Sequence, residues 1–350
     1  MRVHFYARHL YYLPQFLPVA EVMSESHEVS FGYSDRVTRG EEQILRRGVT
    51  MRGWPIHGPS DAQARAQQAD ILIVGASAGV EDLAGASALV VLLFHSIGMK
   101  KIYYTDTHPR INVRFIESDY HRTRCLEYAP EVTTHAVGFA KLDPLYGEGS
   151  PNDLSLPSGE EPKILYAPTF YPGSIELLGH LIPSWPRDWQ IVIKPHQFTL
   201  TNPFYRYQRV LLQDLSKQYA NITLLPLEAY NILPAFRWAD VLVSEISSTI
   251  IEYTVMDRPI VVCDQVHLRW HHRWGGGPYF QRRLDTELLS KIDFAHRAVR
   301  ADEVSNKVQY ALEHRDELSA FRQAGRDLLV GPYDGQASRR IAKLIEEAVA

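Results

Sequence analysis

One stretch decides the fold of this chain: it reads ADVLVSEISSTIIEY and covers residues 239–253. Residues 241–243 are a short apolar run of the kind that forms a strand covered on both faces of a sheet. Ser247, Ser248 and Thr249 follow where a helix would begin, and the first amides of a helix have no partners within it. Those amides and the neighbouring hydroxyl groups attract anions. The segment therefore predicts a strand, a turn and a helix start that can hold a phosphate.

A simpler interpretation of the same turn stays open. Thr249 and Glu252 have the spacing of a capping box, in which two side chains satisfy the free amides at a helix start. On that interpretation the hydroxyl groups serve the helix itself, and the turn binds no ligand.

Strands alternate with helical patterns along the whole chain, in two blocks. The first block has predicted strands at residues 3–7, 27–33, 71–74, 88–94, 114–118 and 133–137. The second has them at residues 163–167, 190–194, 222–225, 241–243 and 260–263. This alternation is typical of parallel sheets with helices on both faces. We therefore expect an α/β protein with two doubly wound, Rossmann-like domains facing each other across a cleft.

The domain boundaries follow from the same pattern. Residues 1–146 form the predicted N-terminal domain and residues 163–334 the predicted C-terminal domain. Residues 147–162 are polar, rich in Gly, Pro and Ser and without periodicity, which is typical of a linker. Residues 335–350 carry a final helical pattern.

The composition excludes several classes of protein. The 350 residues carry a formal net charge of -4, and no run of Lys and Arg interleaves with aromatic residues, so nucleic acid is not an expected partner. Two cysteines far apart in the sequence exclude a disulfide scaffold and suit a reducing compartment. The N-terminus lacks the pattern of a signal peptide, and no apolar run is long enough to cross a bilayer. We expect a cytoplasmic protein whose membrane contact, if any, is peripheral.

Polar residues that directly follow strands are the candidates for function. His95 ends the most apolar strand of the first block, and an imidazole titrates near pH 6.5, which suits a general base. Lys194 and His196 flank Pro195, which ends a strand of the second block and leaves both side chains at its rim. Thr169 lies in the turn after the first strand of that block. Each of these residues is also compatible with a plain turn or cap.

The first strand is followed by HLYYLPQ, residues 9–15. His9, Tyr11 and Gln15 have side chains that bind hydroxyl groups, and their place after a strand puts them at the ligand edge of a doubly wound sheet. The alternative is a core-packing loop with a proline-initiated helix.

Six motifs occur in one order along the chain: FHSIGMK at 94–100, GFAKLD at 138–143, APT at 167–169, KPH at 194–196, DVLVSEISS at 240–248 and DGQAS at 334–338. In this order they resemble the CDP-glycerol glycerophosphotransferase family, whose members build teichoic acid-type polymers. The resemblance implies the GT-B fold, with residues 335–350 crossing back to the N-terminal domain. That N-terminal domain would bind the acceptor and the C-terminal domain the nucleotide.

The resemblance also implies roles for individual residues. His95 would deprotonate an acceptor hydroxyl, which attacks the β-phosphate of a CDP-linked polyol and expels CMP. His196 would act with it as the second catalytic residue. The remaining phosphate-binding candidates are Thr169, Lys194, Glu245, Ser247, Ser248 and Thr249. On the acceptor side the candidates are His9, Tyr11, Gln15 and Lys100.

The resemblance implies neither a metal nor another cofactor, since amides, imidazoles and hydroxyl groups can neutralise the phosphates. The expected donor is CDP-glycerol or another CDP-polyol. The expected acceptor is a lipid-linked or polymeric saccharide at the inner face of the cytoplasmic membrane. Glu245 and Ile246 replace the Asp-Tyr of the family motif, and Ser96 replaces a glycine, changes that concern the choice of substrate. The oligomeric state is left open.

Other classes remain as alternatives. A GT-B glycosyltransferase with a nucleotide-sugar donor shares the fold, but its retaining members place two Glu eight positions apart, whereas Glu245 and Glu252 are seven apart. A sugar-nucleotide 2-epimerase is a further enzyme alternative. A non-catalytic nucleotide-binding module would keep the hydroxyl-rich turn and leave His95 without a role.

Overall fold

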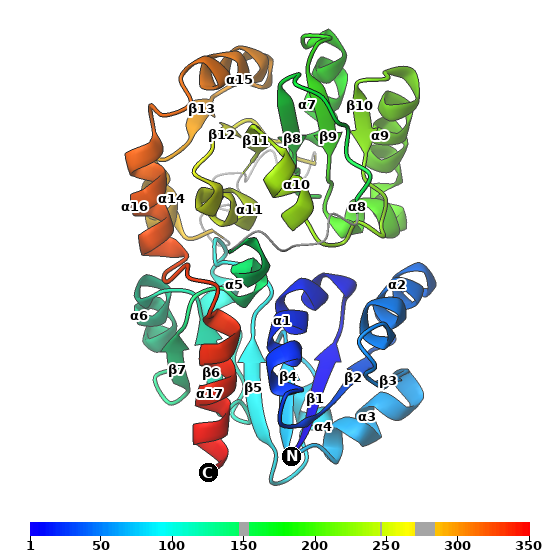
Figure 1. Cartoon of the computed structure of the whole chain (residues 1–350), viewed down its shortest axis with the longest axis vertical. Helices are drawn as coiled ribbons and strands as arrows, with labels where there is room; N and C mark the ends of the chain where they lie inside the picture. The colour runs from blue at the N-terminus through cyan, green and yellow to red at the C-terminus, as the bar shows by residue number, and fades with distance from the viewer. Residues whose placement is uncertain (147–153, 246, 270–283) are drawn as a thin grey trace. The chain divides into compact units, whose positions relative to one another are not determined.

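The computed structural model describes residues 1–146, 154–245, 247–269 and 284–350 (Figure 1). The chain forms two compact units. Unit 1 takes in Met1–Gly98, Ile102–Gly149 and Asp327–Ala350, and unit 2 takes in Met99–Lys101 and Ser150–Arg326. Of the predicted linker 147–162, residues 147–153 lie outside the described part.

Unit 1 is built on a sheet of seven strands in the order β3-β2-β1-β4-β5-β6-β7, with every pair parallel. The strands are β1 (Arg2–Ala7), β2 (Glu28–Tyr33), β3 (Ile56–His57), β4 (Ile71–Val74), β5 (Leu89–Leu93), β6 (Val113–Ile116) and β7 (Thr133–Ala136). The helices are α1 (Leu13–Met23), α2 (Arg39–Thr50), α3 (Pro59–Gln67), α4 (Val80–Leu83), α5 (Ile102–Thr105), α6 (Asp119–Tyr128) and α17 (Ala337–Val349). Strand order reverses between β1 and β4, which is where doubly wound sheets bind ligands.

Unit 2 repeats this plan with six parallel strands in the order β10-β9-β8-β11-β12-β13. The strands are β8 (Lys163–Tyr166), β9 (Gln190–Ile193), β10 (Ile222–Leu224), β11 (Val241–Ser244), β12 (Ile260–Cys263) and β13 (His296–Ala298). The helices are α7 (Ile175–Leu181), α8 (Gln197–Thr201), α9 (Arg206–Gln218), α10 (Leu233–Trp238), α11 (Ser248–Glu252), α14 (Thr286–Ser290), α15 (Val304–Glu313) and α16 (Ser319–Leu329). Here the order reverses between β8 and β11. The predicted α/β class with two doubly wound sheets is confirmed.

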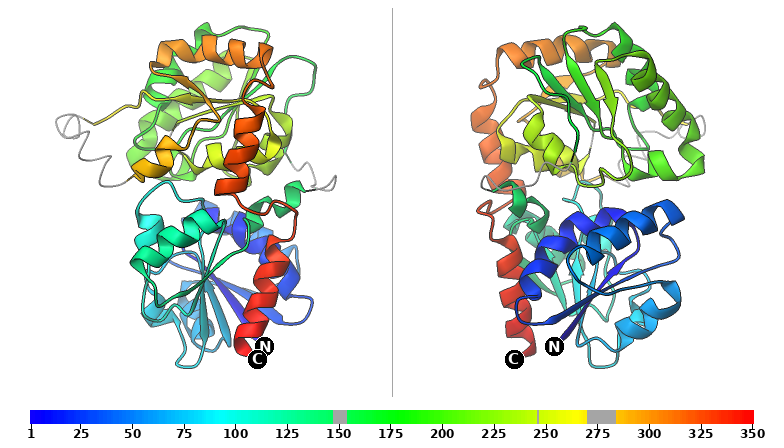
Figure 2. Two further views of the ribbon diagram at one scale, coloured as in Figure 1. Left: turned by 90° about the vertical axis from the view of Figure 1, so that its left-hand side faces the viewer. Right: turned by 45° about the vertical axis from the view of Figure 1, so that its right-hand side comes forward.

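The helix α17 is fixed to unit 1 by two of the sequence motifs, which meet in space. Asp143 accepts hydrogen bonds from the amides of Ala337 (3.1 Å) and Ser338 (2.7 Å) and from the Ser338 hydroxyl (2.6 Å). Gly138 has a φ of 86°, and a Cβ there would lie 2.5 Å from the carbonyl oxygen of Pro332, so only glycine fits. α17 then packs beside α1 (Figure 2). GFAKLD and DGQAS therefore form one structural joint.

We expect Asp143→Ala to lower the free energy of unfolding by about 2 to 4 kcal/mol, because it removes the acceptor of three hydrogen bonds at the start of a half-buried helix. Urea unfolding followed by circular dichroism measures this. Asp82→Ala, which removes an exposed carboxylate of the same unit, is the matched control. An equal stability of the two variants would show that α17 does not depend on this cap.

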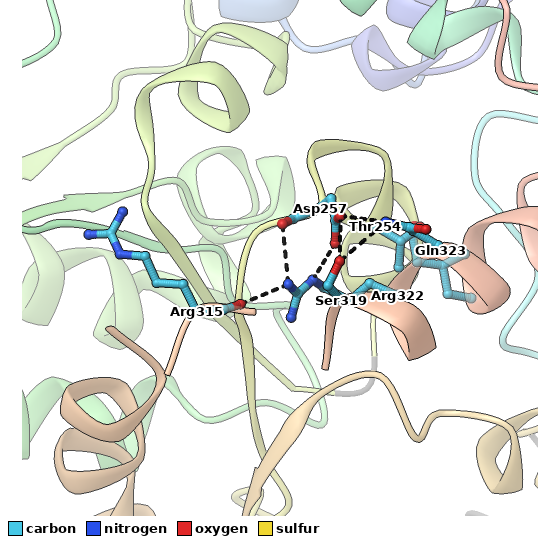
Figure 3. Close-up of polar contacts among 7 residues, drawn as sticks. Thr254, Asp257, Arg315, Ser319, Arg322 and Gln323 are labelled. Atoms are coloured by element: carbon cyan, nitrogen blue, oxygen red, sulfur yellow. Dashed lines mark hydrogen bonds and ion pairs between the residues drawn. The ribbon is translucent and has the colours of Figure 1, made fainter. Parts of the chain in front are cut away.

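A second joint anchors the segment that begins at Ser247. This segment continues through α11 to Asp257, which adopts a left-handed φ of 47°. The fully buried Arg322 of α16 donates to Asp257 Oδ1 (2.9 Å), and Ser319 and Gln323 donate to Oδ2 (2.7 and 2.9 Å; Figure 3). The end of the hydroxyl-rich segment is thus tied to α16.

No helix within the described ranges combines the length and the apolar character that a bilayer span requires.

Candidate functional site

In unit 1 the candidate residues gather at the carboxyl ends of β1, β4 and β5, which are neighbours in the sheet. His9 follows β1, Gly75 follows β4 and His95 follows β5. Because these strands are parallel and adjacent, the loops that follow them meet at one edge. This edge contains the point at which strand order reverses.

Four rings form a cluster at this edge, which we call the ring cluster: His9, Tyr11, Tyr12 and His95. The His95 ring stacks on Tyr12 with 4.9 Å between centroids and lies 4.5 Å from Tyr11. The His9 ring stacks on Tyr11, which also contacts His95, with 4.8 Å between the His9 and Tyr11 centroids. A Cβ at Gly75 would lie 2.5 Å from the Tyr12 ring, so the glycine makes room for the cluster. The structure therefore brings the predicted base together with two predicted acceptor-side residues.

Burial and nearby positive charge set the protonation of the ring cluster. Burial, and to a smaller extent the positive charges of Arg8 and Arg36, lower the pKa of His9 to about 4. Burial also raises the pKa of Tyr12 to about 12 and that of Tyr11 well above its ordinary value. Near pH 7 these three rings are neutral, so they can offer hydrogen bonds without adding charge.

Two predicted acceptor-side residues lie elsewhere. Gln15 is 3% exposed on α1, and its Oε1 accepts a hydrogen bond from the amide of Lys141 (2.8 Å). Lys100 is grouped with unit 2, where its backbone bridges to Leu284 and its ammonium lies 5.9 Å from the Phe170 ring. Gln15 therefore packs inside unit 1 and Lys100 is grouped with the other unit, apart from the ring cluster, and their acceptor-side roles stay predictions.

In unit 2 the candidates follow β8, β9 and β11, three strands that are adjacent in the sheet. Thr169 follows β8, His196 follows β9 and Ser247 follows β11. The amide of His196 donates to the carbonyl of Pro168 (3.1 Å), which ties the loop after β9 to the turn after β8. The predicted phosphate-binding residues therefore share one edge, again where strand order reverses.

His196 has a defined tautomer in this arrangement. Its Nδ1 accepts a hydrogen bond from the amide of Phe198 (3.1 Å) and so caps α8. In a neutral imidazole the other nitrogen, Nε2, then carries the proton. His196 is therefore suited to donate a hydrogen bond to a phosphate oxygen. Its predicted partner Lys194 is half-buried, with Nζ 3.5 Å from the carbonyl of Pro195.

Glu245 holds the turn that carries Thr169. Its Oε1 accepts from the amides of Thr169 (2.9 Å) and Ser174 (3.1 Å), and its Oε2 accepts from the Ser174 hydroxyl (3.0 Å). The residue is fully buried, and burial raises its pKa to about 7. A Cβ at Gly173 would lie 2.7 Å from the Thr169 carbonyl, so the turn closes tightly around the carboxylate. Glu245 thus supports the turn, which differs from the predicted direct contact with a phosphate.

The helix α11 begins two residues earlier than the capping box predicts. Ser247 is the N-cap, and its Oγ accepts from the Thr249 amide (3.4 Å) and donates to Thr249 Oγ1 (3.1 Å). Glu252 is buried at the end of α11, so the predicted pairing of Thr249 with Glu252 is wrong. Ser247, Ser248 and Thr249 are all half-buried.

Sequence reasoning missed an aromatic group beside this edge. The Phe170 ring contacts the rings of Phe198 and Tyr205, each at 5.2 Å between centroids, and the His196 ring lies 4.6 Å from it. The Arg269 guanidinium lies 4.1 Å above the Phe204 ring and 4.3 Å above Tyr171. The signal was present in the clustered aromatics of FYPG (170–173) and PFYRY (203–207).

Within the ranges that the structure covers, no three His, Cys, Asp or Glu side chains are arranged to hold a metal ion.

Comparison with known proteins gives a family and a fold. The family model described as CDP-Glycerol:Poly(glycerophosphate) glycerophosphotransferase matches residues 121–347. A search of curated proteins finds no match. Among solved structures, a variant of the wall teichoic acid polymerase TagF soaked with CDPG is 13% identical, with a TM-score of 0.69 over 99% of this chain and 88% of that chain.

Epimerases are also similar in structure. A putative UDP-N-acetylglucosamine 2-epimerase from Listeria monocytogenes is 14% identical, with a TM-score of 0.63 over 99% of this chain and 96% of that chain. The UDP-GlcNAc 2-epimerase from Neisseria meningitidis, bound to UDP-GlcNAc, is 13% identical with the same TM-score over 99% and 100%. At these identities the likeness concerns the fold alone, and it confirms the predicted GT-B class.

Proposed function

Because this chain belongs to the CDP-glycerol:poly(glycerophosphate) glycerophosphotransferase family and is a transferase, we propose that it moves glycerol phosphate from CDP-glycerol to an acceptor hydroxyl and releases CMP. One observation carries the assignment of the donor site. Thr169, His196 and Ser247 follow three adjacent parallel strands at the point where their order reverses. All three motifs lie within the stretch that the family model matches.

The donor's diphosphate would be held by groups that donate hydrogen bonds. His196 offers Nε2–H, and Ser247 and Ser248 offer hydroxyl groups at the start of α11. Thr169 contributes its hydroxyl, and the Lys194 ammonium balances negative charge. Such donors stabilise charge on the leaving phosphate, which is the main contribution a protein makes to phosphoryl transfer.

His95 would serve as the general base for the acceptor. It takes the proton of an acceptor hydroxyl while the hydroxyl oxygen bonds to the β-phosphorus of CDP-glycerol. The bond from that phosphorus to the oxygen bridging to the α-phosphate breaks, and CMP leaves with the electron pair. His95 precedes the stretch matched by the family model, so its role rests on the FHSIGMK motif and on the ring cluster.

We propose as acceptor a lipid-linked or polymeric saccharide or its growing glycerol phosphate chain, in the synthesis of a teichoic acid-type polymer on the cytoplasmic side of the membrane. Peripheral contact with that membrane would bring the enzyme to such an acceptor.

Binding of CDP-glycerol tests the donor site without the acceptor. We expect the double variant Ser247→Ala, Ser248→Ala to bind CDP-glycerol at least tenfold more weakly than wild type, or about 1.4 kcal/mol, because two hydroxyl donors are lost. Isothermal titration calorimetry with CDP-glycerol, CDP-ribitol, CMP and UDP-N-acetylglucosamine provides the measurement.

The matched control is the double variant Ser184→Ala, Ser290→Ala, which removes two exposed hydroxyl groups of the same unit. It should bind as wild type does. Binding of UDP-N-acetylglucosamine without binding of any CDP compound would contradict the proposal and favour a glycosyltransferase or an epimerase.

A further inference from the structure

The Tyr103 ring of α5 contacts the loop that carries His95 on both sides of the histidine. Tyr103 is 4% exposed, and its ring meets the Phe94 ring edge-on, with 4.9 Å between centroids. Phe94 in turn stacks on His95 at 5.0 Å. Further along the loop, a Cβ at Gly98 would collide with the Tyr103 ring, so the glycine lets this ring lie against the backbone. The FHSIGMK motif therefore packs on one aromatic side chain.

A buried carboxylate holds the hydroxyl of Tyr103. Glu117 directly follows β6, the strand next to β5, and is 2% exposed. Its Oε2 accepts a hydrogen bond from the Tyr103 hydroxyl, and its backbone carbonyl accepts one from the amide of Gly138 (2.9 Å). The Nδ1 of the fully buried His121, on α6, lies 4.0 Å from the same Oε2. The Tyr103 side chain is thus anchored to the end of β6.

The backbone of α5 is tied to the same strand by a separate contact. Arg114 of β6 is 3% exposed, and its Nη1 donates to the carbonyl of Tyr104 (3.2 Å). Its Nη2 donates to the carbonyl of Asp106. Arg114 therefore fixes the main chain of α5, whereas Glu117 fixes the side chain that supports the loop of His95. Loss of the hydrogen bond between Tyr103 and Glu117 would leave the helix in place and release the ring.

The carboxylate of Glu117 gives this anchor a defined direction. Burial of a carboxylate costs free energy that an apolar side chain would avoid. In return, a hydroxyl group that donates to a carboxylate forms a shorter and stronger hydrogen bond than one between neutral groups. A general base needs such precision, because misplacement by about 1 Å can lower a rate by about 100-fold.

We propose that Tyr103 and Glu117 are positioning residues that hold His95 in line with the acceptor hydroxyl, acting through Phe94 and Gly98. They touch neither donor nor acceptor and take up no proton during transfer. The inference rests on the proposed function, because it concerns the orientation of the proposed base.

The kinetics of CMP release test this inference, with CDP-glycerol as donor and a synthetic glycerol phosphate trimer as acceptor. The double variant Tyr103→Phe, Glu117→Leu removes both partners, so no buried carboxylate is left unsatisfied. We expect its kcat to fall by about tenfold or more, while its affinity for CDP-glycerol, measured by calorimetry, stays at the wild-type value. Glu117→Gln, whose amide oxygen can still accept from Tyr103, should keep kcat within about threefold of wild type. Tyr128→Phe, which removes the hydroxyl of a 45% exposed ring on α6, is the matched control.

The His95→Ala background separates positioning from a general loss of structure. If the pair acts through His95, adding Tyr103→Phe and Glu117→Leu to His95→Ala should cause no further loss of rate. A merely structural role would lower the rate again by the same factor. Such a second loss would overturn the inference, as would a wild-type kcat in the double variant.

A spectroscopic readout of His95 does not depend on catalysis. In NMR spectra of protein isotope-labelled at the histidine Cε1, the His95 signal is the one that His95→Ala removes. We expect this signal to move or broaden in the Tyr103→Phe, Glu117→Leu variant and to stay in place in Tyr128→Phe. An unchanged His95 signal in the double variant would contradict the inference. Absence of CMP release by wild type would instead refute the proposed function, and the His95 signal would still decide whether the pair positions this ring.

Discussion

Replacement of His95 by alanine is expected to lower the rate of glycerol phosphate transfer by about 100- to 10,000-fold, the usual contribution of a general base. The affinity for CDP-glycerol should not change, because the proposed donor residues follow β8, β9 and β11 of unit 2, whereas His95 follows β5 of unit 1. Steady-state assays of CMP release, with calorimetry for donor binding, provide the two measurements.

His95→Gln is the matched control for packing. Glutamine keeps a polar side chain against Tyr11 and Tyr12 but cannot take up a proton near pH 7. It should be as slow as His95→Ala while unfolding at a temperature close to that of wild type. Transfer at the wild-type rate by either variant would contradict the assignment of the base and revive the non-catalytic interpretation.

Replacement of Glu245 by alanine is expected to lower the free energy of unfolding by about 3 kcal/mol or more. The two buried donors of Ser174 and the half-buried amide of Thr169 would lose their acceptor, and each unsatisfied buried donor costs about 1 to 3 kcal/mol. The turn that carries Thr169 would also lose its support, so CDP-glycerol should bind more than tenfold more weakly. Urea unfolding and calorimetry measure the two effects.

Glu245→Gln is the conservative counterpart. Its amide oxygen can accept from the amides of Thr169 and Ser174, and its NH2 can donate to the Ser174 hydroxyl, which then donates to Tyr166. The variant should keep CDP-glycerol affinity within a few-fold of wild type. Donor binding by Glu245→Ala as tight as that of wild type would contradict the view that this carboxylate positions the turn.

The same residue predicts a pH dependence of stability. Burial raises the pKa of Glu245 from its ordinary value of 4.5 to about 7, so the folded protein holds this proton more tightly than the unfolded chain. Protonated Glu245 therefore contributes to the free energy of unfolding in full below pH 4.5, and this contribution is lost as the pH rises through 7. The change amounts to roughly 3 kcal/mol, and Glu245→Gln should abolish it. Of the titratable neighbours Tyr166, Cys263 and Glu176, burial raises the pKa of the first far above 10 and that of the second to about 12, so neither titrates in this range.

The sheets could be predicted because parallel strands are buried on both faces. Residues 71–74 and 260–263 are continuous apolar runs, and the structure makes strands of both. The edge strands β3 and β13 were not predicted, because strands of two or three residues, such as His296–Ala298, are too short to show a periodic pattern. The helix α2 is hard to predict because its sequence, RGEEQILRRGVT, is mostly polar and does not begin at an apolar run.

The site was predictable where polar residues directly follow core strands, as with His95 and His196, because topology alone takes them to the ligand edge. Sequence spacing could not show which side chains face inward. The side chain of Gln15 accepts a hydrogen bond from the amide of Lys141, and that of Glu245 accepts one from the amide of Thr169, both far away in sequence.

The most direct test of the account is to incubate the purified protein with CDP-glycerol and a glycerol phosphate trimer, and to follow the nucleotide product by chromatography and the trimer by mass spectrometry. The account predicts release of CMP in equal amount to trimer extended by one glycerol phosphate. Parallel reactions with UDP-N-acetylglucosamine should leave both compounds unchanged. Release of UDP, or 2-epimerisation of the sugar, with CDP-glycerol left intact would contradict the account.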